Sequence, residues 1–168
     1  DSNGDGVVGW GLPVAWDAYG DGTTNAADTE YTITTAIVID ALITWAERDA
    51  EAPRERIDAL VDAAIEPYLD GRNASPSGMA AYSLASADRR YDTFNPAAYL
   101  AGQMQRASTR VAEPVRRARY LDAADAKAWR LRFNADGTVT IHKCTAGAGP
   151  YSNILDYYAR GLAGLTPV

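Results

Sequence analysis

The chain has 168 residues, 47% of them hydrophobic and 23% charged, which is typical of one globular domain with its own hydrophobic core. The net charge of −6 argues against a nucleic-acid partner, because phosphate backbones are bound through clusters of cations. No apolar run approaches the ~20 residues of a membrane-spanning helix, so no membrane partner is expected. A single Cys144 excludes an internal disulfide, and with one histidine the chain lacks the usual zinc ligands.

The charge is distributed unevenly along the chain. Residues 1–52 carry ten acidic side chains and one basic side chain, Arg48, whereas the remainder has a basic excess. Several arginines occur between residues 106 and 119, at a spacing that places most of them on the outer faces of two neighbouring helices. We expect these faces to be solvated, and the alternative is a surface for an acidic partner or an anionic glycan. The arginines are Arg106, Arg110, Arg116, Arg117 and Arg119.

We treat residues 1–168 as a single α-helical domain, in which residues 1–31 form a glycine- and aromatic-rich loop region without helical periodicity. The first six residues, DSNGDG, match the first half of a calcium-binding loop, with oxygen ligands at positions 1, 3 and 5 and glycine at position 6. Leu12 stands where a bidentate glutamate is needed. We therefore expect weak calcium binding at most, or a plain polar turn, and no required cofactor. The candidate ligands are Asp1, Asn3 and Asp5.

Hydrophobic spacing predicts a first helix over about residues 29–48, with Ile33, Ile37, Ala41 and Trp45 along its buried face. The neighbouring Val38, Leu42 and Ile43 widen this face. Residues 53–69 form the second helix, which Pro67 kinks or ends one turn early.

After a long polar connection over residues 72–94, a third helix is expected at about 95–106 and a fourth at 113–128. The fourth should bury Val115, Ala118, Leu121 and Ala124. Alternating apolar residues around Asp136-Gly137 predict one short β-hairpin near residues 129–143, and a fifth helix follows at about 152–165. The fold class is therefore mainly α, with antiparallel helical hairpins and one short β-hairpin.

Three groups of short stretches carry a resemblance to a known family. The first comprises residues 9–12 (GWGL), 16–23 (WDAYGDGT) and 31–36 (YTITTA). The second comprises residues 82–84 (YSL), Asp88, 95–98 (NPAA) and 101–102 (AG), and the third 153–158 (NILDYY) with 161–162 (GL). Together they resemble α/α-toroid proteins that process uronate polysaccharides, notably the C-terminal domain of glucuronyl C5-epimerases. Five helices are about half of a closed toroid of six helix pairs, so the chain resembles a partial toroid.

The resemblance implies a cleft lined by inter-helix loops, a polysaccharide or oligosaccharide partner, and epimerisation or β-elimination at C5 of a uronate. This chemistry needs a base and an acid on opposite sides of the C5–H bond, and groups that stabilise the carboxylate. The candidate catalytic residues are Tyr82, Tyr151 and Asp17. The candidate substrate-binding residues are Trp10, Trp16, Tyr19, Arg89, Arg90, Asn153 and Asp156.

Loops at residues 10–31, 78–94 and 145–158 each lead into an odd-numbered predicted helix, so we expect them to meet on one face. An enzyme is one hypothesis for this face. A non-catalytic carbohydrate-binding or protein-interaction module of a larger exported protein is the alternative, in which Trp10, Trp16 and Tyr19 stack on sugar rings. Either function predicts an extracellular or periplasmic location, although the chain shows no signal peptide.

Overall fold

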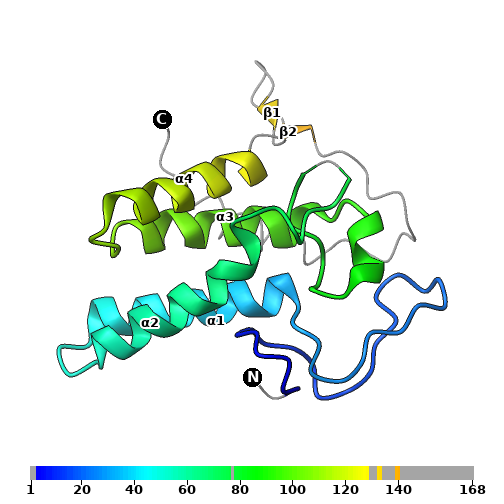
Figure 1. Ribbon diagram of the computed structural model, residues 1–168, viewed down its shortest axis with the longest axis horizontal. Coiled ribbons are helices and arrows are strands. Elements are labelled where there is room, and N and C mark those ends of the chain that lie inside the picture. The colour runs from blue at the N-terminus through cyan, green and yellow to red at the C-terminus, as the bar shows by residue number, and fades with distance from the viewer. Residues whose placement is uncertain (1–2, 77, 129–131, 134–138, 141–168) are drawn as a thin grey trace.

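A computed structural model gives the fold and describes residues 3–76, 78–128, 132–133 and 139–140 (Figure 1). The chain is mainly helical, as the sequence predicts. The described part contains four α-helices, and none of them is long and apolar enough to cross a membrane.

The helices form two packed layers. In the lower half of Figure 1, α1 (Thr32–Arg48) lies beside α2 (Arg54–Ile65), and in the upper half α3 (Phe94–Ser108) lies beside α4 (Pro114–Ala128). Helix α3 packs on α1 and joins the two layers through one hydrophobic core. The largest fully buried apolar side chains of this core include Ile39, Ile43, Ile65, Leu100 and Met104.

Two short strands lie within the segment where the sequence predicts a β-hairpin. Strand β1 (Arg132–Phe133) pairs antiparallel with β2 (Val139–Thr140), with Arg132 opposite Thr140 and Phe133 opposite Val139. The other residues of the predicted hairpin lie outside the described part of the chain. The predicted fifth helix, residues 152–165, also lies outside it.

Helix α1 begins later than predicted and buries a different face. It begins at Thr32 because Tyr31 is extended, its N–H donating to the Trp10 carbonyl at 3.0 Å. The centre of the expected face is wrong, because Ile37 is 40% exposed and Trp45 is 45% exposed. Ile43, at the edge of the expected face, is fully buried as predicted, and so is Ile39, which the spacing did not select. Spacing could not identify the buried face, because this helix is apolar on most sides.

The buried face of α1 includes two threonines whose hydroxyls are satisfied. Thr32 Oγ1 donates to the Ala81 carbonyl at 2.5 Å, and Thr35 Oγ1 accepts from the Trp10 N–H at 3.1 Å. Because these hydrogen bonds remove the cost of burying a hydroxyl, threonine can face the core here. They also attach the loops before α1 and before α3 to the same face of the helix.

Helix α2 ends where Pro67 predicts. The α-helix stops at Ile65, and the 3₁₀ helix η1 (Glu66–Tyr68) continues it by one turn. Tyr68 closes this turn inside the core, where burial raises the pKa of its phenol to about 12. A second 3₁₀ helix, η2 (Ser86–Arg90), lies in the connection between η1 and α3.

Helix α4 is rotated relative to the prediction. Val115 is 68% exposed and Leu121 is also exposed, while Tyr120, Ala123 and Ala124 are buried. Only Ala124 of the expected face is therefore correct. The Tyr120 hydroxyl donates to the Asp62 carboxylate on α2. Because its polar end has this partner, the tyrosine can be buried in the interface between the two helices.

The arginines of α3 and α4 contact the acidic helices rather than solvent alone. Arg106 pairs with Asp40 and Glu47 of α1, and Arg110 pairs with Asp58 of α2 at 2.7 Å. On α4, Arg116 and Arg119 pair with α2 or with the η1 turn that follows it. Basic side chains of α3 and α4 therefore pair with acidic side chains of α1, α2 and η1 across the interface between the two layers.

Candidate functional site

Two of the three predicted loops meet beside the start of α1. Tyr31 forms an isolated antiparallel bridge with Ser83. The Leu84 N–H donates to the Glu30 carbonyl at 2.9 Å, and the Thr32 N–H donates to the Tyr82 carbonyl at 2.9 Å. Segments 10–31 and 78–94 are therefore joined through their backbones. Segment 145–158 lies outside the described residues.

Four tyrosines from these two loops stack into a continuous row, which we call the tyrosine row. Its ring centroids are 4.2 Å apart between Tyr91 and Tyr19, 5.8 Å between Tyr19 and Tyr82, and 5.4 Å between Tyr82 and Tyr31. The last two pairs have the edge-to-face geometry that aromatic rings prefer. The row runs from the partly exposed Tyr91 to the buried Tyr31 and fixes the two loops against each other.

The outer end of the tyrosine row carries a group of charges. The Tyr91 hydroxyl donates to Asp21 Oδ2 at 2.6 Å, and Arg90 donates to the same oxygen at 2.9 Å while lying 5.1 Å from the Tyr91 ring centre. Hydrogen bonds from Thr23 and then from Tyr91 lower the pKa of Asp21 to about 2. Donation to Asp21 in turn raises the pKa of Tyr91. This carboxylate is ionised over the whole neutral range.

Asp17 organises the turn that precedes these charges. Its Oδ1 accepts backbone N–H groups from Tyr19, Gly20 and Asp21, and its Oδ2 accepts the Gly22 N–H at 2.9 Å. The hydrogen bond from Gly22 contributes most to lowering the pKa of Asp17. Both carboxylate oxygens are therefore used to hold the backbone.

A buried polar group lies at the inner end of the tyrosine row. Asp88 is 2% exposed and accepts hydrogen bonds from Asn25 Nδ2 at 2.8 Å and from Ser83 Oγ at 2.5 Å. The Asn25 amide also contacts the Tyr31 hydroxyl, whose pKa is raised by burial. Sequence reasoning did not select Asn25 or Ser83, because no local pattern shows that residues so far apart share one carboxylate.

The two tryptophans proposed to stack on sugar have different environments. Trp16 is 45% exposed on a narrow loop, where its backbone N–H and C=O both bond to Asn25. Trp10 packs against the core and uses its backbone to hold Tyr31 and Thr35. Only Trp16 presents a large part of its ring to an external partner.

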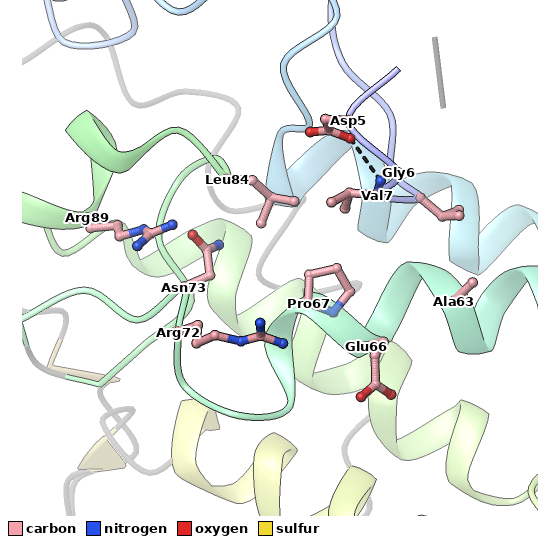
Figure 2. A pocket seen from close by; sticks show the side chains of 11 residues that line it. Asp5, Gly6, Val7, Ala63, Glu66, Pro67, Arg72, Asn73, Leu84 and Arg89 are labelled. Atoms are coloured by element: carbon pink, nitrogen blue, oxygen red, sulfur yellow. Dashed lines mark hydrogen bonds between the residues drawn. The ribbon is translucent and has the colours of Figure 1, made fainter. Parts of the chain in front are cut away.

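A cavity of about 510 Å³ lies between the N-terminal segment, the end of α2 and η2 (Figure 2). Val7, Val8, Pro67 and Leu84 contribute apolar wall, and Asn73 contributes an amide. Its charged lining consists of Asp5, Glu66, Arg72 and Arg89. The adjacent arginines therefore belong to different sites: Arg89 lines the cavity, and Arg90 pairs with Asp21 at the end of the tyrosine row.

The proposed calcium ligands form a polar turn. Asn3 Nδ2 donates to Glu30 Oε1 at 2.8 Å, Asn3 Oδ1 accepts the Asp5 N–H, and Asp5 Oδ1 accepts the Val7 N–H at 2.8 Å. In the part of the chain that the structure describes, which excludes Asp1, no three acidic, histidine or cysteine side chains gather as metal ligands. Weak calcium binding remains a prediction.

Comparison with protein-family models, curated protein sequences and solved structures finds no match. The case for a function therefore rests on the geometry of the described residues. Tyr151, Asn153 and Asp156 lie outside that part of the chain. Of the remaining site residues, Asp17, Tyr19, Tyr82 and Arg90 belong to the tyrosine row or its charged end, and Asp5 and Arg89 belong to the cavity.

Proposed function

We propose that the chain is a non-catalytic carbohydrate-binding domain that binds a polysaccharide or oligosaccharide on the surface formed by loops 10–31 and 78–94. The observation that carries the proposal is the outer end of the tyrosine row. There a partly exposed aromatic ring, Tyr91, lies beside the ion pair of Arg90 and Asp21. A sugar offers both an apolar C–H face and a ring of hydroxyls, and this surface presents a partner for each.

Exposure supports a surface rather than a deep active site. Arg90, on loop 78–94, has 48% of its side chain accessible, and Trp16, on loop 10–31, is 45% exposed. Tyr19 is held by its contacts with Tyr82 and Tyr91 and by a 2.5 Å hydrogen bond between its hydroxyl and that of Thr93. Rigid aromatic groups lose little conformational entropy on binding, which favours recognition of a flexible polymer.

The acid–base properties favour binding over catalysis. A carboxylic acid that donates a proton needs a raised pKa, but Asp17 and Asp21 both have lowered values. The carboxylate of Asp17 is also occupied by backbone N–H groups, so an epimerase- or lyase-like reaction on a uronate, with Tyr82 and Asp17 as catalytic residues, is the less supported alternative.

We also propose a partial α/α toroid as the architecture and a location outside the cytoplasm. Two packed helix pairs are what a partial α/α toroid would contain, and loops at one end of such pairs would form its binding face. A polysaccharide partner implies an extracellular or periplasmic location, where such polymers occur.

The two tryptophans provide a matched test. Trp16 and Trp45 are equally exposed, at 45%, but Trp45 lies on α1 and its indole N–H donates to Asp49. Affinity electrophoresis through gels containing dextran, xylan, alginate or polygalacturonate measures binding to neutral and acidic polymers. We expect Trp16→Ala to weaken binding about two- to tenfold, because stacking on one ring contributes about 0.5–1.5 kcal/mol, and Trp45→Ala to leave it unchanged.

Arg90→Gln tests the polar half of the surface, and it should weaken binding without unfolding the protein. Failure of every polymer to retard the wild-type chain would overturn the proposed function. Equal effects of Trp16→Ala and Trp45→Ala would also contradict it, because they would show that retardation does not depend on the loop surface.

A further inference from the structure

The side-chain amide of Asn73 is buried and has no partner among the described residues. Asn73 is 4% exposed, and neither its Nδ2 nor its Oδ1 forms a hydrogen bond within that part of the chain. Its backbone is firmly held, since its carbonyl accepts the Ala81 N–H at 3.0 Å and the next residue, Ala74, bridges to Ala80. A buried amide without partners is costly, so its presence calls for a function.

Asn73 lies in the wall of the 510 Å³ cavity. Figure 2 shows its amide directed into the space between Arg89 and Leu84. Both amide atoms are buried just beneath this wall, so a ligand would accept a hydrogen bond from Nδ2 after a small shift of the covering side chains, which would remove part of the cost of burial.

The cavity wall around Asn73 is cationic. Arg89 projects from η2 and forms no ion pair or hydrogen bond with the residues that the structure describes. Arg72 pairs with Asp70 at an exposed position, and its guanidinium extends along the lower wall in Figure 2. Two guanidinium groups and one amide donor thus line the same side of the cavity.

The acidic lining does not cancel this charge. Glu66 already pairs with Arg116 at 3.0 Å and with Arg119 at 3.4 Å, both of which come from α4. Asp5 accepts the Val7 N–H and lies at the opposite edge from Arg89 in Figure 2. Arg89 is therefore left without a counter-ion in the described cavity wall.

We infer that this cavity binds a small organic carboxylate. Its carboxylate would accept hydrogen bonds from Arg89 and Asn73, with Arg72 adding positive charge, and its carbon skeleton would lie against Val7, Pro67 and Leu84. A planar carboxylate with two oxygens matches the fork of a guanidinium, and the apolar wall favours a ligand with a hydrocarbon body over an inorganic anion. The site is separate from the tyrosine row and does not depend on the proposed carbohydrate function.

Two probes of the same shape test the assignment with the full chain. Cyclohexanecarboxylate and cyclohexanemethanol differ in charge but carry the same ring, and calorimetry at pH 7 measures the binding of each. We expect the carboxylate to bind at least tenfold more tightly than the alcohol. Arg89→Gln should abolish this preference, whereas Arg117→Gln should keep it, because Arg117 binds the Val111 carbonyl outside the cavity.

Equal affinity for the two probes, or an unchanged preference in Arg89→Gln, would overturn the inference. Inorganic phosphate provides a further comparison: binding as tight as that of cyclohexanecarboxylate would show a general anion site and would overturn the carboxylate assignment. Trp16→Ala should bind the carboxylate normally, so loss of glycan binding and loss of carboxylate binding are distinguishable.

Asn73→Leu separates a ligand-binding role from a structural one. Because leucine removes an unpaired buried amide, we expect the melting temperature to rise by a few degrees while carboxylate affinity falls at least tenfold. A fall in the melting temperature would show that the amide has a structural partner and would contradict the inference. Unchanged carboxylate affinity in a stabilised variant would contradict it as well.

Discussion

Arg106 of α3 forms an ion pair with Asp40 of α1, and the other oxygen of the same carboxylate accepts a 2.7 Å hydrogen bond from Tyr99. Arg106 also reaches Glu47, about two helical turns further along α1, at 2.8 Å. Asp40 is therefore the acceptor for two groups that cross the interface between the helix layers. An acidic residue in a mainly apolar helix is explained by these two donors.

Asp40→Ala should destabilise the fold by about 1–3 kcal/mol, because it removes a carboxylate that accepts hydrogen bonds from both Tyr99 and Arg106 across the interface. Arg119→Ala is the comparison, since its 3.4 Å pair with Glu66 is half exposed and should contribute at most about 0.5 kcal/mol. Urea denaturation followed by circular dichroism measures both. Equal losses for the two variants would show that Asp40 has no special role.

The two faces of α1 give a second prediction. Ile39 is fully buried, so Ile39→Ala should cost about 2–5 kcal/mol through lost burial and the cavity it leaves. Ile37 is 40% exposed, and Ile37→Ala should cost less than about 1 kcal/mol. The same denaturation experiment distinguishes them. If Ile37→Ala were the more damaging change, the face predicted from spacing would be the correct one.

The number and position of the first four helices could be predicted because their apolar periodicity and their prolines are local signals. Pro67 ended α2 where expected, and Pro114 begins α4. The buried faces of α1 and α4 were not predictable in the same way. They depend on partners far away in sequence, such as the Ala81 carbonyl for Thr32 and Asp62 for Tyr120.

The candidate site also contains residues that the sequence could suggest and residues that only the fold reveals. The aromatic and charged composition of loops 10–31 and 78–94 selected Tyr19, Tyr82 and Arg90 as candidates, and the structure places all three in one cluster around Tyr91. The cavity was missed, because Asn73 and Arg72 resemble an ordinary polar turn in the sequence. Only the fold shows that the N-terminal segment covers this turn and leaves the Asn73 amide without a partner among the described residues.

Gly11 is required where the N-terminal loop passes the strand-like segment before α1. A Cβ at this position would lie 2.2 Å from the Thr29 carbonyl oxygen, which belongs to the backbone and cannot rotate away. Gly11→Ala should therefore cost about 2–3 kcal/mol. Gly71→Ala has open space around it and should cost only about 1 kcal/mol, from its positive φ of 75°. Thermal unfolding of the two variants compares them, and equal melting temperatures would refute the close approach at Gly11.

The hydrogen bond between Tyr91 and Asp21 predicts a specific pH dependence. The folded protein lowers the pKa of Asp21 from 3.8 to about 2, so the ionised carboxylate stabilises the loops above pH 4. This stabilisation is lost as the pH falls from about 4 to 2, because protonation removes the acceptor for Thr23, Tyr91 and Arg90. Tyr91 behaves oppositely: its raised pKa means that its contribution is present below pH 10 and disappears above it.

Tyr91→Phe tests this coupling directly, because it removes one donor to Asp21 and keeps the aromatic ring. Carboxyl-detected NMR titration should show the pKa of Asp21 moving up toward 3.8 in the variant, while the pKa of Asp17 stays low because backbone amides hold its carboxylate. Asp17 therefore serves as the internal control within the same spectrum. An unchanged pKa of Asp21 would mean that Thr23 and Arg90 hold the carboxylate without Tyr91, and that the tyrosine row is not anchored at its outer end.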